Sequence, residues 1–362
     1  MPQELIDMVL YTLYASPFCE DGETLKNCSL TCRAWLPASR ARLFEFVQFG
    51  HPKDILSFSG ILRQSPCLAC YVRTLEIVAF DECVPYSDED LDALRTIVAS
   101  MDRVQCLYLT GDALSFPFLD CLPRMDSVLE LNVYHADFDD IGSYTGLFAA
   151  LPNVEDVDIN TISAPMSDDE LIPLLVVAPK LRGVRLSDGC LGAYAPLLPS
   201  ALVHLTISVS NLRDLRQFCS VLYQSNAASS LTALVIEDMT GLCDDEPEPY
   251  EVDDPEPYEG LLRRCTALEY FGFHGSLTWA VSMMQSAPDS VTHVTLNFPQ
   301  DSMGGFRHLA TALNCERLPH LESVAVYLRK SETPGDFDAT ELPTIFPDLH
   351  DRGIWKLEWW DR

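Results

Sequence analysis

A six-residue pattern that recurs eleven times constrains the fold of this chain more than any other feature. In LRGVRL, Leu181 to Leu186, apolar residues occupy the first, fourth and sixth places, and the places between them are polar or small. This alternation is typical of a short strand that turns one row of side chains into a core and the other toward solvent. The other copies begin at Val72, Val104, Val128, Val154, Leu202, Leu231, Leu268, Val291, Leu321 and Ile354.

The intervals between copies predict the rest of the repeating unit. Successive copies start 21 to 37 residues apart, and all but one of the intervals hold a segment with the apolar spacing of a helix. A unit of strand, loop, helix and loop cannot bury its own apolar face, so neighbouring units must stack on it. We therefore predict an α/β fold, a solenoid whose parallel sheet lines the concave side and whose helices cover the convex side.

Capping residues mark where some of these helices begin. Ser87 followed by Asp90 predicts a helix over Leu91 to Met101, and Ser167 followed by Glu170 predicts a second one. In each pair a hydroxyl and a carboxylate satisfy backbone N–H groups that the first turn of a helix leaves without partners.

Two rows of side chains in the predicted strands point away from the core, at the fifth and seventh places of each copy. Tyrosine, arginine and histidine occur in these rows, and such residues dominate the binding energy of many interfaces. A merely hydrated sheet face is the other interpretation, and it stays open. The candidate protein-binding residues are Tyr108, Asn132, Tyr134, Asp158, Arg185, Glu237, His274 and Tyr327.

Residues 1–49 do not follow the repeat and are predicted to form a separate unit of three helices. Apolar residues recur at helical spacing from Leu5 to Leu13, Asp21 can cap a second helix, and an apolar side from Trp35 to Val47 indicates a third. Three helices of this length bury little surface by themselves, so we expect the unit to pack on a partner or on the repeats.

This N-terminal unit resembles an F-box. The run MPQELIDMVLYTLY followed by LKNCSLTCRAWLPASRARLFEFV is similar to the family pattern of Leu-Pro, a helix of paired aliphatic residues, then Leu, a Cys-Arg pair and Trp. Met1 stands in the place of the usual leading Leu. With its array of degenerate repeats, the chain is similar to the large F-box-like families of mushroom-forming fungi. The matching positions are Pro2, Leu5, Ile6, Val9, Leu25, Cys32, Arg33 and Trp35.

The resemblance implies that this unit docks on a Skp-type adaptor. Leu5, Ile6, Val9 and Trp35 are expected at the centre of the docking face. The full set of expected adaptor contacts is Pro2, Leu5, Ile6, Val9, Leu25, Cys28 and Trp35.

The repeats themselves resemble a leucine-rich repeat, with one departure. That family places Asn or Cys three residues after the sixth position, where the side chains form a ladder between repeats. In four copies the position holds Ile162, Gly189, Ser210 or Met239 instead. We therefore describe residues 55–362 as a leucine-rich-repeat-like array and expect its curvature to be irregular.

Two segments interrupt this organisation. Residues 50–54 form a short linker in which Asp54 can cap a helix over Ile55 to Arg63. Residues 244–259 carry nine acids, no base and four prolines, so we predict a mobile acidic insertion. A solvated loop and a flexible arm that attracts a basic partner both remain possible interpretations of it.

Charge and apolar composition exclude several classes of partner. The formal net charge is −30, from 54 acids against 24 bases, so contact with nucleic acid or an anionic membrane would be repulsive. The longest apolar run, 171–179, is half the length that a bilayer requires, and the first residues lack the pattern of a secretion signal. We therefore expect a cytoplasmic or nuclear protein.

No motif in the sequence predicts catalysis, a cofactor or a metal. A glycine-rich phosphate loop, a nucleophile elbow and a kinase signature do not occur. CLAC, Cys67 to Cys70, has zinc spacing, but no second Cys or His pair lies at a matching distance. The thirteen cysteines, among them Cys28, Cys106, Cys219 and Cys265, are expected to be reduced residues of the core.

The function that the resemblance implies is that of a substrate receptor. The chain would be the subunit of a Skp–cullin–F-box ubiquitin ligase that holds a protein target, possibly basic, on its concave face. No covalent step would occur on it, so it would not be an enzyme. The alternative is a stand-alone acidic repeat protein that scaffolds or inhibits a basic protein and needs nothing from residues 1–49.

Overall fold

The structure is a computed structural model in which the chain divides into two compact units. Unit 1 comprises Met1–Ser167 with Val177–Lys180, and unit 2 comprises Asp168–Val176 with Leu181–Arg362. The residues that the structure describes are 3–14, 22–31, 33–78, 87–111, 122–135, 141–160, 179–187, 200–209, 218–219, 222, 226–238, 262–298, 303–329 and 342–360. The predicted insertion 244–259 and the helix predicted after Ser167 lie outside them.

Unit 1 begins with a helical head, made of α1 (Gln3–Tyr14), α2 (Gly22–Thr31) and α3 (Leu36–Leu43). Its core contains Ile6, Leu10 and Leu25, all buried. Ile6 and Leu10 are one helical turn apart, so both turn the same side of α1 toward the other helices. The half-buried side chains packed against this core are Cys28, Trp35, Ala38 and Leu43.

The head ends earlier than the sequence predicted, because Phe46–Phe49 forms strand β1 and not the last turns of a helix. This strand pairs in parallel with β2 (Thr74–Val78), with Phe46 opposite Thr74. Phe44, Val47 and Phe49 stand at the first, fourth and sixth places of the repeat pattern, so residues 44–49 are a further copy. The predicted boundary at residue 49 was wrong for that reason.

The linker predicted over 50–54 is also shorter than expected, since α4 runs over Pro52–Gln64. Asp54 does cap this helix, but from inside its first turn. Its Oδ2 accepts hydrogen bonds from the backbone N–H groups of Gly50, at 3.1 Å, and of His51, at 2.9 Å. A carboxylate in the first turn satisfies free N–H groups and the positive end of the helix dipole together.

The remaining strands of unit 1 are β3 (Cys106–Thr110), β4 (Glu130–Tyr134) and β5 (Asp156–Asn160). From β1 to β5 each strand pairs in parallel with the next one along the chain. The third, fifth and seventh places of the copies that begin at Val72, Val104, Val128 and Val154 are in register. The first, fourth and sixth places of these copies are buried, as predicted.

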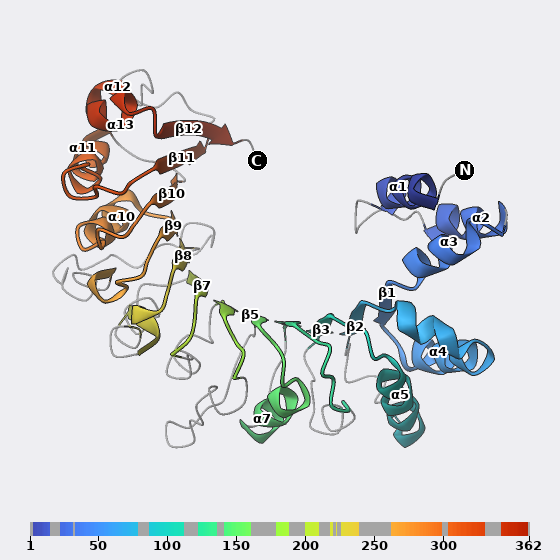
Figure 1. The fold of residues 1–362 in the computed structure, drawn as a ribbon. Helices are drawn as coiled ribbons and strands as arrows, with labels where there is room; N and C mark the ends of the chain where they lie inside the picture. The colour runs from blue at the N-terminus through green and yellow to red at the C-terminus, as the bar shows by residue number, and fades with distance from the viewer. Residues whose placement is uncertain are drawn as a thin grey trace. The chain divides into compact units, whose positions relative to one another are not determined.

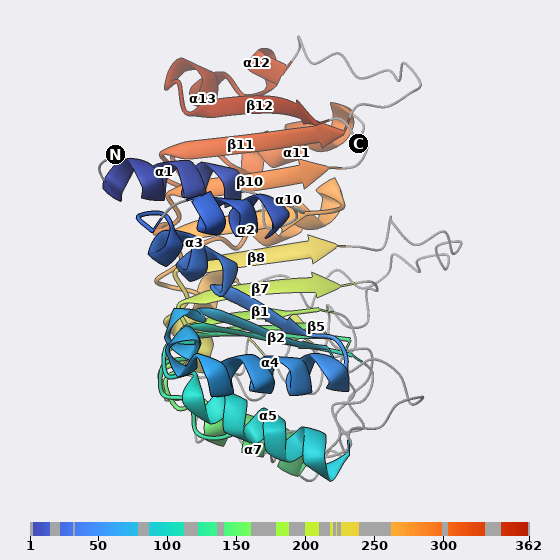
Figure 2. The same cartoon turned by 90° about the vertical axis from the view of Figure 1, so that its right-hand side faces the viewer.

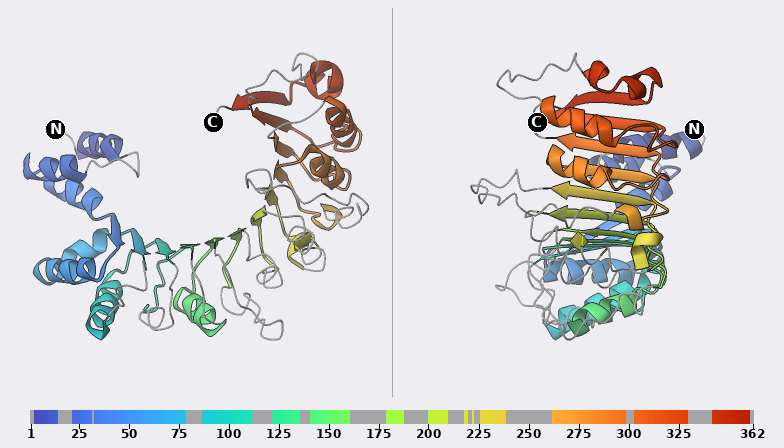
Figure 3. Two further views of the ribbon diagram at one scale, coloured as in Figure 1. Left: turned by 180° about the vertical axis from the view of Figure 1, so that it is seen from behind. Right: turned by 90° about the vertical axis from the view of Figure 1, so that its left-hand side faces the viewer.

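Helices cover one side of the unit 1 strands (Figures 1 and 3). They are α4, the 3-10 helix η1 (Pro66–Tyr71), α5 (Asp88–Ser100) and α7 (Ile141–Ala150). Ser87 caps α5 as predicted, because its Oγ accepts from the N–H of Asp90 while the Asp90 carboxylate accepts from the N–H of Ser87, at 2.9 Å.

Unit 2 repeats this arrangement with seven described strands, all paired in parallel in chain order (Figure 2). Helices lie on one side of the strands. The strands are β6 (Gly183–Leu186), β7 (His204–Val209), β8 (Ala233–Asp238), β9 (Tyr270–His274), β10 (His293–Phe298), β11 (Ser323–Arg329) and β12 (Trp355–Trp360). The helical segments described in unit 2 include η4 (Asn226–Ser229), η5 (Leu262–Arg264), α10 (Leu277–Met284), α11 (Met303–Ala312), α12 (Leu342–Ile345) and α13 (Pro347–Asp351).

The last strand departs from the predicted register by two residues. Val326 pairs with Leu357 and Tyr327 with Glu358, so Lys356, and not Glu358, lies beside Ala325. A shift of two keeps the same side chains on the same face. Trp355 stacks on Phe346 of the adjoining segment, with ring centroids 4.4 Å apart.

Side chains just before three of the copies form hydrogen bonds to the backbone of the preceding copy. Ser230 Oγ donates to the carbonyl oxygen of Leu202 at 2.7 Å, and Ser290 Oγ donates to that of Leu268 at 2.8 Å. Arg352 Nη2 donates to the carbonyl oxygen of Leu321 at 2.7 Å. In each bond the donor side chain belongs to a residue one or two positions before the start of a copy. The acceptor is the backbone carbonyl of the first residue of the preceding copy. The four predicted departures, Ile162, Gly189, Ser210 and Met239, lie outside the described residues.

Candidate binding surfaces

In unit 1 the predicted binding residues lie on the side of the strands opposite α4, α5 and α7. Tyr108 of β3, Asn132 of β4 and Asp158 of β5 are paired neighbours in one row. Tyr134 lies in the next row, between Thr110 and Asn160. We call the outward side chains of β2–β5 the unit 1 strand face. None of the described helices of unit 1 lies against this face (Figures 1 and 3).

Two tyrosines form the centre of this face. The rings of Tyr108 and Tyr134 stack with centroids 6.3 Å apart and an angle of 20° between their planes. The Tyr134 hydroxyl donates to Asp158 Oδ2 at 3.1 Å and lies 3.5 Å from Asn132 Oδ1. The two rings therefore form an aromatic platform whose orientation is fixed by a hydrogen bond to a neighbouring strand.

Asn132 supports this platform from below. It is 4% exposed although its row points outward. Its Nδ2 donates to Glu130 Oε1 at 3.0 Å and contacts Cys106 Sγ at 3.4 Å. A buried amide whose donors and acceptor are used fixes its neighbours, because moving it would leave polar atoms without partners. Asn132 is thus a positioning residue and not an exposed contact as predicted.

The charge on the unit 1 strand face has one sign. Its third and fifth places hold Glu76, Glu130, Asp156 and Asp158. Among the described residues at the third, fifth and seventh places of β1–β5 there is no Lys, Arg or His. Burial raises the pKa of the Glu76 carboxyl, which a hydrogen bond from Gln48 opposes.

Cys106 and Tyr108 are neutral on this face at pH 7. Burial, followed by the charge of Glu130, raises the pKa of the Cys106 thiol to about 11. Burial also raises the pKa of the Tyr108 hydroxyl, with a further contribution from Cys106. A thiol with so high a pKa is a poor nucleophile, so Cys106 acts here as a small packing residue.

In unit 2 three of the four predicted residues lie near one another. Arg185 Nη2 and Glu237 Oε1 are 3.8 Å apart, and Ser208 Oγ donates to Glu237 Oε2 at 2.7 Å. His274 pairs with Glu237 across β8 and β9. Burial lowers the pKa of the His274 imidazole, while Glu237 acts in the opposite direction. Tyr327 is two strands away from His274, beside Asn297 and Glu358.

The predicted adaptor-binding set divides between the surface and the interior of the head. Leu5 and Val9 are 43% and 38% exposed, and Met8 between them is 58% exposed. These three residues form an apolar stripe on one side of α1, which we call the α1 stripe. Ile6 and Leu25 are buried in the head, and Cys28 and Trp35 pack against them, so these four support the head. Pro2 and Cys32 lie outside the described residues.

The sequence reasoning missed Met8, Glu130 and Ser208. Met8 could have been found from its spacing of three and one residues to Leu5 and Val9, which places all three on one helical face. Glu130 stands at a third place, a row that was not considered, whereas Ser208 stands in the seventh-place row and was not selected from it. Their partners, Asn132 and Glu237, are fixed only by strand register.

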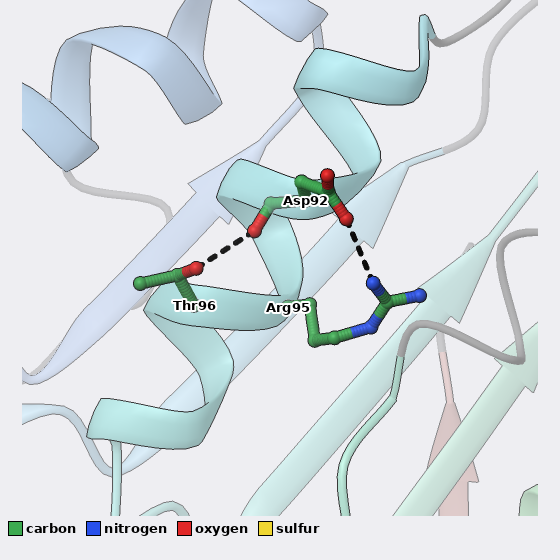
Figure 4. Close-up of polar contacts among 3 residues, drawn as sticks. All are labelled: Asp92, Arg95 and Thr96. Carbon is green, nitrogen blue, oxygen red and sulfur yellow. Dashed lines mark hydrogen bonds and ion pairs between the residues drawn. The ribbon is translucent and has the colours of Figure 1, made fainter.

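A groove between α4 and α5 was also not predicted. It has a volume of about 430 Å³, and apolar side chains such as Leu56, Ala93 and Ile97 line it together with polar and charged ones. Asp92 stands at its rim, where its Oδ1 pairs with Arg95 Nη1 at 2.7 Å and its backbone carbonyl accepts from Thr96 Oγ1 at 2.8 Å (Figure 4). Both charges of the pair are exposed, so the pair contributes little to stability.

The described residues contain no group of three or more His, Cys, Asp or Glu side chains placed to hold a metal ion. Cys67 and Cys70 are free thiols on η1, and Cys70 Sγ donates to the carbonyl oxygen of Cys67 at 2.9 Å. The predicted core cysteines are free as well: Cys219 and Cys265 are buried, and Cys28 and Cys106 are half-buried. None of the described helices combines the length and the apolar character needed to span a bilayer.

Comparison with known proteins assigns no family to the chain. No family model and no curated protein matches it. Among solved structures, the TLR13–ssRNA13 complex matches with 12% identity and a TM-score of 0.36, over 89% of this chain and 37% of that chain. A protein from Bacteroides fragilis matches with 11% identity and a TM-score of 0.35, over 87% of this chain and 73% of that chain. At such low TM-scores neither match bears on function, and the α/β parallel-strand fold rests on the strand pairing described above.

Proposed function

We propose that the chain is a non-catalytic substrate receptor of a Skp–cullin–F-box ubiquitin ligase. The observation that supports this proposal is the α1 stripe. Leu5, Met8 and Val9 are exposed together, while Ile6 and Leu10 on the other side of the same helix hold the head together. An amphipathic helix that presents apolar residues at this spacing on an otherwise packed domain is typical of a docking site for another protein.

The two parts of unit 1 suit the two tasks of such a receptor. The α1 stripe would hold the Skp-type adaptor, and through it a cullin. The unit 1 strand face would hold the protein target, because the stacked side chains of Tyr108 and Tyr134 are of a type suited to protein contacts. Bringing target and conjugating enzyme together raises their effective concentration without a covalent step on this chain.

A pull-down with a purified Skp-type adaptor tests the proposal. Leu5→Asp combined with Val9→Asp places two charges on the α1 stripe, and we expect adaptor recovery to fall by about tenfold or more, since buried charges at an interface are costly. Ile6→Asp is unsuitable for this experiment, because Ile6 belongs to the core of the head and a charge there would unfold it.

Leu56→Asp combined with Leu129→Asp is the matched control. These leucines are 44% and 41% exposed, so their exposure is similar to that of Leu5 and Val9. Neither of them belongs to α1. We expect this variant to recover the adaptor as well as wild type does. Equal recovery by the α1 variant and wild type would refute docking through the α1 stripe.

The stand-alone acidic scaffold or inhibitor remains a second candidate, favoured by the four carboxylates of the unit 1 strand face. It requires nothing from the α1 stripe. Under that proposal wild type would not recover the adaptor, and Leu5→Asp with Val9→Asp would retain a basic partner captured from the native cell. Affinity purification of these two proteins side by side separates the candidates.

A further inference from the structure

The unit 1 strand face is a sheet surface that the described helices of its unit leave open (Figures 1 and 3). We propose that it binds a cationic segment of a partner protein, rich in arginine, seated against the Tyr108–Tyr134 platform. The proposal deepens the proposed function, because such a segment would belong to the target of the receptor. Binding of the segment itself requires neither the adaptor nor the α1 stripe.

Charge complementarity selects the chemistry of this partner. Glu76 and Glu130 lie on the face on either side of Tyr108, on the neighbouring strands β2 and β4. No basic side chain accompanies them among the described residues at the outward places of β1–β5. A surface of one sign, on a low-dielectric sheet, attracts the opposite charge and repels nucleic acid and anionic lipid. A basic protein segment is therefore the favoured occupant.

The aromatic platform selects arginine among basic residues. A guanidinium group is planar, stacks on aromatic faces and can bond a carboxylate through two N–H groups at once. Tyr108 and Tyr134 present two rings inclined by 20°, and Glu130 lies on the same strand as Tyr134. A guanidinium group on the platform can thus stack on the tyrosine rings and pair with a carboxylate at the same time. An ammonium group does this less well.

The platform is also organised before a ligand arrives. Asn132 is buried beneath it and bonded to Glu130, and the Tyr134 hydroxyl is bonded to Asp158. Side chains that are already ordered lose little conformational entropy on binding. The unit 2 face lacks this combination, since Arg185 lies within 3.8 Å of Glu237 and Lys356 pairs with Glu358.

Titration of a labelled arginine–serine peptide with the full chain tests the proposal by fluorescence anisotropy. Glu76→Gln combined with Glu130→Gln should weaken binding by about fivefold, because each exposed charge pair contributes roughly 0.5 kcal/mol. The matched control is Glu316→Gln combined with Glu322→Gln, which removes the same charge from exposed sites in unit 2. We expect it to change the affinity by less than about twofold.

The result that overturns the proposal is an equal loss in the two glutamine variants, since binding would then follow net charge alone. Failure of wild type to bind the peptide, or equal binding of a peptide with citrulline in place of arginine, would overturn it as well. Glutamine keeps the shape and the accepting oxygen of glutamate, so both variants should fold, and thermal unfolding verifies this.

A second pair of variants tests the platform. Tyr108→Leu should weaken binding of the arginine peptide by about threefold and should weaken binding of a lysine peptide by less. Tyr108→Phe should keep the preference for arginine over lysine. Tyr71→Leu, on η1 and outside both strand faces, is the control and should have no effect. Loss of arginine preference in Tyr71→Leu but not in Tyr108→Leu would overturn the platform. Adaptor recovery by all these variants should equal that of wild type, so failure of this proposal and failure of adaptor docking are distinguishable.

Discussion

The outward strand faces of the two units share a backbone pattern and differ in chemistry. In both, the first, fourth and sixth places of the copies that begin at Val72 through Leu321 are buried, and the fifth and seventh places point away from the helices. In unit 1 those places, with the third, carry carboxylates and a stacked tyrosine pair. In unit 2 they carry Arg185 near Glu237, Lys356 paired with Glu358, and small residues such as Gly272 and Ala325.

The difference teaches that a repeat fixes where a side chain stands but leaves its chemistry open. The buried row is restricted because it must fill a close-packed core. The outward row has no such restriction, so one unit can gather charge of one sign while the other pairs its charges. At Gly272 of unit 2 the neighbour does restrict the residue, because a Cβ built there would lie 3.1 Å from Val235 Cγ2 on the adjacent strand.

The largest expected effect tests whether the buried rows of the two units are equivalent. Leu109→Ala in unit 1 and Leu296→Ala in unit 2 each remove a fully buried sixth-place residue. Each should lower the free energy of unfolding of its unit by about 2–5 kcal/mol, the range for a leucine truncated in a core. Amide hydrogen exchange of β3 and β10 would measure the two losses separately. A loss confined to one unit would contradict the equivalence.

A smaller effect is expected from the outward row, and there the units should differ. Asn132→Ala removes a buried amide that donates to Glu130 Oε1 and contacts Cys106 Sγ, and should cost about 1–2 kcal/mol. Asn297→Ala, at a half-buried outward place in unit 2, should cost less than about 0.5 kcal/mol. Urea denaturation compares the two variants, and equal costs would show that Asn132 does not support the platform.

The smallest effect concerns pH and distinguishes the faces by sign. The pKa of His274 in unit 2 lies below its ordinary value of 6.5, chiefly because of burial, so the unfolded chain binds the proton more readily. Stability is therefore lost as pH falls below 6.5 toward the folded pKa. In unit 1 the raised pKa of Glu76 has the opposite sense, since stability is lost as pH rises through and above the ordinary value of 4.5.

Thermal unfolding of wild type and His274→Gln between pH 7 and pH 5 measures this contribution. The variant should lose less stability than wild type on acidification. Glu76→Gln should instead be stabilised relative to wild type at pH 7. If His274→Gln followed the same pH profile as wild type, burial of the imidazole would have no consequence for folding.

Much of the fold follows from the sequence, and the errors have definite causes. The eleven predicted copies coincide with β2–β12, because alternation along a strand is a local property that a sequence displays directly. Strand β1 was missed although residues 44–49 fit the same pattern, because the apolar spacing from Trp35 to Val47 was taken to indicate a helix. The shift of β12 could not be predicted, since a slip of two residues leaves the alternation unchanged.

For the candidate sites, too, the sequence predicted some features and left others to the tertiary structure. The sequence placed Tyr108, Tyr134 and Asp158 on one outward face and put Leu5 and Val9 on α1, and the structure agrees. Which of these residues meet was not visible in the sequence. The stacking of Tyr108 on Tyr134 and the burial of Asn132 depend on strand register, and the burial of Ile6 depends on how α2 and α3 pack against α1.

The sequence by itself thus determined the period, the buried row and the residue types available on each face, because these depend on neighbours along the chain. Only the tertiary structure decided which side chains contact one another, which are buried among them and which remain exposed. Those outcomes depend on distances between residues some 24 to 29 positions apart, such as Tyr134 with Asp158 and Ser208 with Glu237, and strand pairing alone sets those distances.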